Sequence, residues 1–175
     1  MAKELAIKMT ELERLSLINQ FLILEKLYPE EGDHYESKRL AIERGYQSHY
    51  NDIFVHLWDE MPADKTRKVL DILEMYRAIT WGLSEYFPND KIEEKYKFHG
   101  FDGNNESEEL SYCHYFIVNL KRYQELVYNP EYPSFNSHRE MLPTYERRLD
   151  VYNKVKNKNA FTQLSLEKID EIFES

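Results

Sequence analysis

The chain has 175 residues, a formal net charge of −9 at pH 7 and a single cysteine, Cys113. This length suits one continuous hydrophobic core, so we expect a single domain over residues 1–175. One cysteine excludes an intramolecular disulfide and a structural zinc site built on thiolates, and it fits a reducing compartment. The acidic excess disfavours nucleic acid as a partner, because affinity for phosphate backbones comes largely from clustered Lys and Arg.

The sequence has no segment typical of secretion or of a membrane span. The N-terminus lacks a basic start followed by an apolar stretch, and the densest apolar run, Phe21 to Leu24, is far shorter than the about 20 residues that cross a bilayer. We therefore expect a cytoplasmic protein with no membrane association. Five Gly and six Pro are few for a β-sandwich or barrel, which needs frequent tight turns. The composition favours long helices.

The first predicted helix begins at a capping signal. Thr10 followed by Glu13 has the spacing of a capping box, in which the hydroxyl and the carboxylate each accept from a free helix amide. The helix is expected to run to about Leu27. Its apolar residues cover nearly the whole circumference, which predicts a central, buried helix.

Apolar residues at helical spacing recur along the rest of the chain. Helices are predicted over 33–58, 64–87, 107–127, 141–155 and 165–173. Asp33, Asp64 and Ser165 are the expected N-caps of three of them, and Gly45 is expected to bend or split the first. The sequence therefore predicts an all-α fold, a multi-helical single domain of about six to eight helices.

Several short segments occur in an order and spacing that resemble those of a known family. They are Arg14–Gln20, Ile42–Tyr46, Asp71–Tyr76, Gly100–Asp102, Phe116–Asn119, Phe135–Asn136 and Tyr145–Arg147. Together they span nearly the whole chain, and they resemble the signature segments of the YfbU family of small bacterial proteins. The resemblance implies a multi-helical fold and a bacterial cytoplasmic setting. It implies no activity.

The predicted helix over 64–87 carries a second face opposite its main apolar stripe. Rotation by 100° per residue places Met75, Ala78, Trp81 and Gly82 on that face. The small residues would let another backbone approach closely, and Met75 and Trp81 would supply contact area. Two interpretations remain open: a central helix packed on both sides within one domain, or a surface for a homo-oligomer or a protein partner.

A polar network is the structural interpretation of several charged residues. Glu43 and Arg44 could meet Asp71 and Glu74, since carboxylates on a packed helix need a cation to offset desolvation. Asn19 falls among apolar residues of the first helix, so its amide is expected to form a structural tie. The alternative for Asp71 and Glu74 is a catalytic or metal-binding acid pair. A di-metal site of this kind also needs a Glu-x-x-His element on a partner helix, and none of the predicted helices contains one.

Arg44 and His49 have the bare Arg-x4-His spacing of the HEPN class of helical ribonucleases. Gly45 departs from that class, because a small polar residue or His usually follows the Arg. Arg44, His49 and Glu74 are the candidate catalytic residues, and no reaction is identified. His49 and His56 are too far apart for ligands from adjacent turns, so we expect no metal and no cofactor.

One basic segment runs against the acidic balance of the chain. From His138 to Lys158 it carries Arg139, Arg147, Arg148, Lys154, Lys156 and Lys158 against three carboxylates. A solvated helix face is the simpler interpretation, and a nucleic-acid interface through Arg139, Arg147, Arg148 and Lys154 is the alternative.

Two function classes remain. The favoured one is a non-catalytic interaction or regulatory protein that acts as a homo-oligomer or with a protein partner. The alternative is a small nucleic-acid-acting enzyme or binder in stress or phage-defence biology.

Overall fold

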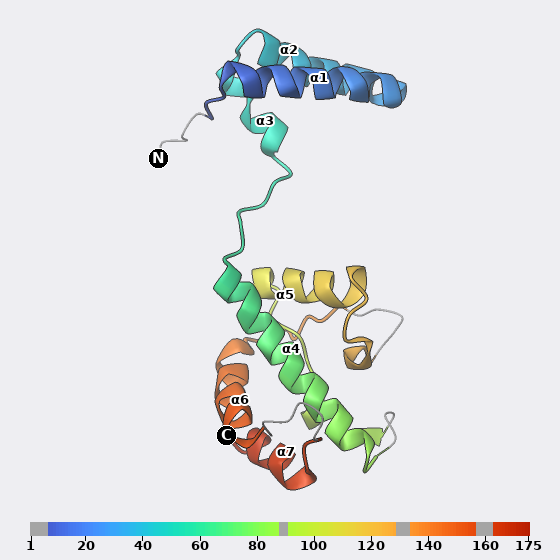
Figure 1. Cartoon of the computed structure of the whole chain (residues 1–175), viewed down its shortest axis with the longest axis vertical. Coiled ribbons are helices and arrows are strands. Elements are labelled where there is room, and N and C mark those ends of the chain that lie inside the picture. The colour runs from blue at the N-terminus through green and yellow to red at the C-terminus, as the bar shows by residue number, and fades with distance from the viewer. Residues whose placement is uncertain (1–6, 88–90, 129–133, 157–162) are drawn as a thin grey trace. The chain divides into compact units, whose positions relative to one another are not determined.

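The computed structural model describes residues 7–87, 91–128, 134–156 and 163–175 (Figure 1). These residues form seven α-helices, and their only β pairing is an isolated bridge between Phe101 and Asn136. The expectation of an all-α fold with about six to eight helices is therefore confirmed. The chain divides into two compact units, Met1–Glu60 and Met61–Ser175, and each has its own hydrophobic core.

The helices follow the predicted order. They are α1 (Glu11–Leu27), α2 (Gly32–Glu43), α3 (Asn51–Phe54), α4 (Ala63–Ser84), α5 (Ser107–His114), α6 (Leu142–Val155) and α7 (Leu166–Phe173). The short 3-10 turns are η1 (Pro29–Glu31), η2 (Gln47–His49), η4 (Glu94–Tyr96) and η6 (Gln124–Leu126), and a π-helical turn, η5 (Tyr115–Asn119), continues α5. The predicted helix over 33–58 is thus split, and the one over 107–127 is shorter than expected.

The first unit is built on an antiparallel hairpin of α1 and α2 (Figure 1). The predicted capping box starts α1, because the Thr10 hydroxyl accepts from the Glu13 backbone N–H and the Glu13 carboxylate accepts from the Thr10 N–H. The Thr10 hydrogen bonds also lower the pKa of Glu13. Gly45 has a φ of +74° just after α2, a conformation that suits glycine, and the expectation that it splits the segment is confirmed.

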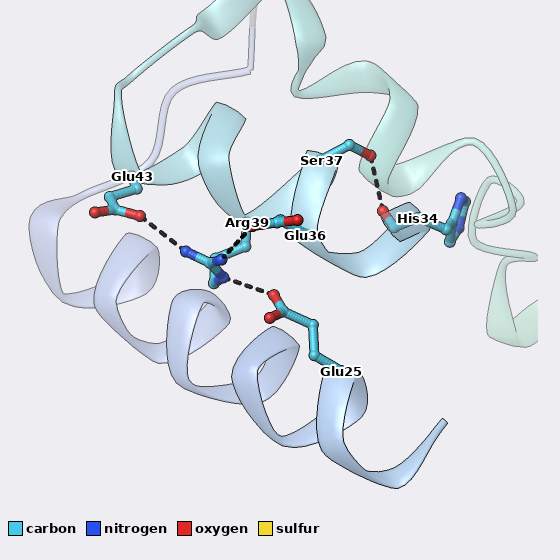
Figure 2. A network of polar contacts seen from close by, with 6 residues as sticks. All are labelled: Glu25, His34, Glu36, Ser37, Arg39 and Glu43. Carbon is cyan, nitrogen blue, oxygen red and sulfur yellow. Dashed lines mark hydrogen bonds and ion pairs between the residues drawn. The ribbon is translucent and has the colours of Figure 1, made fainter. Parts of the chain in front are cut away.

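Two arginines hold the hairpin together. Arg14 of α1 donates to the carbonyls of Ile42 and Glu43, both at 2.9 Å, and so ties α1 to the last turn of α2, where carbonyls lack the regular N–H donor that they have inside a helix. Arg39 of α2 reaches the Glu25 carboxylate of α1 at 2.6 Å, as Figure 2 shows. The hydrogen bond with Glu25 is the largest cause of the raised pKa of Arg39.

The expected burial of α1 is wrong within its own unit. Of its residues only Phe21 is buried, where it packs with Ile42 and Tyr50. The unit supplies one covering helix, α2, while α1 has apolar residues around nearly its whole circumference. Five of the nine apolar residues of α1 are therefore left exposed.

The expected caps at Asp33 and Asp64 are also wrong, while Ser165 does occupy the N-cap position of α7. The η1 turn leads directly into α2 at Gly32, so Asp33 already lies in the first helical turn. Pro62 occupies the N-cap of α4 with φ fixed near −57°, which places Asp64 in the first turn. Both carboxylates lie near the positive end of a helix, where they are favourable without capping it.

The second unit surrounds α4, which packs against α5, α6 and α7 (Figure 1). The predicted apolar stripe of α4 is buried. It consists of Val69, Ile72, Leu73, Tyr76, Ile79 and Leu83. Gly82 allows a close approach by the chain before α7, because an added Cβ would lie 2.7 Å from the Leu164 carbonyl oxygen. This covers one part of the second face of α4 from within the same unit.

Candidate functional site

The exposed apolar side chains are concentrated in the first unit. Ten of the fifteen large apolar side chains that are exposed in the described residues belong to Met1–Glu60, which is about a third of the chain. They are Leu12, Leu15, Leu22, Ile23 and Leu27 on α1, followed by Tyr28, Tyr46, Val55, Leu57 and Trp58. Leu12 is 73% exposed and Leu27 is 64% exposed. Exposed apolar residues gathered on one helix are typical of a contact surface.

Five of the exposed residues of α1 follow a heptad pattern. Leu12, Leu15, Asn19, Leu22 and Lys26 recur at alternating steps of three and four residues, and Ile23 lies beside Leu22. We name these six residues the α1 seam. Alternating steps of three and four place side chains in one line along a helix, which is the arrangement that packs against a second helix in a coiled coil.

The opposite side of α1 is already occupied. Leu17, Ile18, Phe21 and Leu24 pack into the core that the hairpin forms with α2. The α1 seam therefore has no cover within its own unit.

Asn19, one residue of the expected polar network, is exposed in the first unit. Asn19 lies among Leu12, Leu15, Leu22 and Ile23 as predicted, but that apolar layer is at the surface of its unit. Its amide therefore stays accessible to a partner group.

The charged members of the network have partners of their own. Glu43 pairs with Arg39 at 3.1 Å, and the Glu74 carboxylate accepts from the Tyr123 hydroxyl at 2.7 Å. Arg44 and Asp71 are exposed. Since Arg44 belongs to the first unit and both α4 carboxylates to the second, their pairing stays a prediction.

The second face of α4 is largely covered by its own unit. Met75 and Gly82 are buried and Ala78 is half-buried, so Trp81, at 44% exposure, is the most accessible of the four predicted interface residues. The guanidinium of Arg77 lies 4.1 Å from the Trp81 ring centre and shields part of it. An oligomeric contact at this face stays a prediction and would rest mainly on Trp81.

The candidate catalytic pair of the first unit is exposed. His49 lies 3.5 Å from Asp52, and no hydrogen bond or ion pair between described residues joins it to Arg44. His49 and His56 line one cavity of about 480 Å³ together with His34. In the described part of the chain, no group of three His, Cys, Asp or Glu side chains is arranged to hold a metal ion.

The basic segment separates into two groups. Arg139 and Arg148 line one cleft of about 290 Å³, which also receives Lys95, His99 and Thr144. Arg147 instead donates to the Pro143 carbonyl and the Thr144 hydroxyl, and Lys154 is exposed farther along α6. Lys158 lies outside the described residues. Sequence reasoning missed Lys95 and His99, because they lie 44 and 40 residues before Arg139 along the chain.

The fold and these sites define an all-α protein with a helical hairpin and an α4-centred bundle. The family model of the YfbU domain matches residues 7–175. The UPF0304 protein MJECS11 of Methanocaldococcus jannaschii is 32% identical over 154 residues, which are 86% of this chain and 90% of that protein. The chain therefore belongs to the YfbU family.

Family membership confirms the resemblance seen in the sequence, and it brings no activity with it. The relative from Methanocaldococcus jannaschii is archaeal, so membership does not by itself indicate a bacterial source. No helix in the described part of the chain combines the length and the hydropathy that a membrane span requires.

Proposed function

We propose that this chain is a non-catalytic interaction or regulatory protein of the cytoplasm that works as a homo-oligomer, with the α1 seam as the contact between two copies. The observation that carries the proposal is the uncovered heptad pattern of α1 in a unit that buries only one face of that helix. Apolar side chains in such a line are favourable only when a second helix removes them from water.

The arrangement of the seam supports a second copy as the occupant. Asn19 lies midway between Leu12 and Lys26, so an antiparallel two-fold pairing would place Asn19 opposite its own copy. An amide carries both a donor and an acceptor, so two identical amides can satisfy each other. A single polar Asn in such a seam also specifies register and oligomeric state.

The charges of α1 support the same antiparallel orientation. Its first turn contains Glu11 and its last turn contains Lys26. An antiparallel copy would bring each Lys26 towards the acidic first turn of the other helix. A parallel pairing would instead place like charges together at both ends, which is unfavourable.

The magnitude of the burial predicts a weak association. Each of the four apolar side chains of the α1 seam, Leu12, Leu15, Leu22 and Ile23, would contribute on the order of 1 kcal/mol when its remaining surface is covered. Two copies would thus contribute about 8 kcal/mol, against an association cost of about 4–15 kcal/mol. The gain and the cost are similar in size, so we expect a dimer that forms at high protein concentration, with a Kd on the order of 0.1 mM.

Sedimentation of the full chain over a range of concentrations tests the proposal. Leu22→Glu should shift the chain to monomer, because it places a charge in the contact. Leu120→Glu is the matched control, since Leu22 is 43% exposed and Leu120 is 45% exposed but lies in the other unit. The control should remain dimeric.

Three results would contradict the proposal. The first is a wild-type chain that is monomeric at all concentrations. The second is a Leu22→Glu chain that still dimerises. The third is a dimer that Trp81→Ala converts to monomer while Leu22→Glu does not, which would place the contact on α4.

A further inference from the structure

The cleft at the start of α6 gathers cationic and hydrogen-bonding side chains from separate parts of the second unit. Lys95 comes from η4, His99 follows it, Arg139 precedes α6, and Thr144 and Arg148 lie on successive turns of α6. The cleft measures about 290 Å³. This is near the lower limit of small-molecule sites and fits a compact ligand.

The charge of the cleft is opposite to that of the whole chain. Lys95, Arg139 and Arg148 contribute three positive charges, and Glu140 is the one carboxylate in the lining. Lys95 also lies 3.5 Å from the carboxylate of Glu93, which is outside the lining. The lining therefore carries a smaller excess of positive charge, supplied mainly by Arg139 and Arg148, in a chain whose net charge is −9. A compact anion is the ligand that this balance matches.

Arg148 is held by contacts within the second unit and keeps one donor without a partner among the described residues. One of its terminal nitrogens donates to the Tyr76 hydroxyl at 2.6 Å, and its guanidinium lies 4.1 Å from the ring centre of Phe173. Its Nε is buried and has no hydrogen-bond partner among the described residues. Since Tyr76 is neutral over the physiological range, with a pKa raised by burial to about 12, it does not compensate the charge of Arg148.

His99 completes the donor set as a neutral group. Burial is the largest cause of its lowered pKa, and the positive charges of Arg139 and Arg148 act in the same direction. Glu94, 3.8 Å away, opposes this shift. A neutral imidazole donates one hydrogen bond without adding a further positive charge to the cleft.

We propose that this cleft binds a small phosphomonoester or inorganic phosphate through Arg139, Arg148 and Lys95. Arginine presents several N–H donors in a fixed planar arrangement that matches the oxygens of phosphate, and charge-assisted hydrogen bonds of this kind are strong. A nucleic-acid backbone needs a continuous basic track, and Arg147 and Lys154 lie outside the cleft lining. A small phosphate compound is therefore the better match.

Titration calorimetry of the full chain with inorganic phosphate, adenosine 5′-monophosphate and adenosine provides the test. The two phosphate compounds should bind, and adenosine should not. Arg139→Gln should weaken phosphate binding about tenfold or more, because a charge-assisted hydrogen bond is lost. Arg147→Gln is the matched control on the same basic segment, and its affinity should equal that of the wild type.

A second measurement follows Arg148 itself. The NMR signals of the Arg148 side-chain N–H groups should shift when inorganic phosphate is added, because an anion then lies beside the guanidinium. If inorganic phosphate produces neither a binding heat in calorimetry nor an NMR shift at Arg148, the proposal is wrong. A different result would favour a nucleic-acid surface and overturn the proposal. The chain would then bind a single-stranded oligonucleotide but not inorganic phosphate, and Arg147→Gln and Arg139→Gln would weaken that binding equally.

The phosphate proposal stands independently of the oligomer. Leu22→Glu should leave phosphate affinity unchanged, since the cleft is formed within the second unit alone.

Discussion

Gly100 is the residue whose substitution the structure restricts most severely. Its φ is +84°, a region that side chains disfavour, and an added Cβ would lie 1.8 Å from the Phe135 carbonyl oxygen. The Gly100 carbonyl also accepts from the buried Tyr145 hydroxyl at 2.9 Å. We expect Gly100→Ala to lower the free energy of unfolding by more than about 2 kcal/mol, measured by urea denaturation.

Gly32→Ala is the matched control. Gly32 has helical φ and ψ at the start of α2, and an added Cβ there meets no atom within 4 Å. This substitution should leave stability unchanged or raise it by about 0.5–1 kcal/mol. Equal stability of the two variants would contradict the close approach at Gly100.

The sequence reveals residue-scale features only where their partners are close along the chain. Thr10 and Glu13 are three residues apart, and their capping box was predicted. The partner of Gly100 is thirty-five residues away, and Lys95 and Arg148 are brought together by the fold. Asn19 was placed correctly among apolar neighbours, yet a helical wheel cannot tell which face of a helix the protein covers.

At the scale of elements, one buried carboxylate joins the starts of two helices. Glu106 precedes α5, and its carboxylate accepts from the backbone N–H groups of Met141 and Leu142 at 2.7 and 2.6 Å, where α6 begins. It also accepts from the Asp102 N–H at 2.8 Å. The side chain is only 3% exposed, so no solvent replaces it.

Glu106→Ala should therefore destabilise the second unit strongly. Three backbone N–H groups would lose their acceptor, and unsatisfied buried donors cost about 1–3 kcal/mol each, partly relieved by relaxation. We expect a loss of about 3 kcal/mol in the free energy of unfolding. Glu108→Ala, in the first turn of α5, removes only an exposed ion pair with Lys65 and should cost less than about 1 kcal/mol. Similar losses for the two variants would mean that Glu106 does not act as the acceptor described.

The bounds of the helices were easier to predict from the sequence than the burial of each helix. The expected helices over 64–87, 141–155 and 165–173 agree closely with α4, α6 and α7, because apolar spacing is a local property. The burial expected for α1 was wrong because burial depends on how many other elements pack around a helix. A helix that is apolar on all sides fits a protein core, and it equally fits a helix that binds a second copy.

For the whole molecule, the two units differ greatly in the size of their cores. In the described residues, the first core has three buried members, Phe21, Ile42 and Tyr50, whereas the second has twenty-one. Composition gave no linker between them, and the family match spans both. The expectation of one domain over 1–175 therefore stays a prediction, and separate expression of the two units tests it.

We expect the segment Met61–Ser175 to fold by itself, with cooperative unfolding and a melting temperature within a few degrees of that of the full chain. Its core is large enough for independent stability, and its helices pack on α4 without help from the first unit.

The first unit should behave differently, because a core of three residues is too small to stabilise about sixty residues against chain entropy. The segment Met1–Glu60 should therefore be mostly unfolded when dilute and gain helix as its concentration rises, because pairing through the α1 seam supplies the missing burial. Circular dichroism over a concentration series checks this, and Leu22→Glu in the short segment should abolish the gain. If Met61–Ser175 instead fails to fold alone, the chain behaves as the single cooperative domain that its sequence predicts.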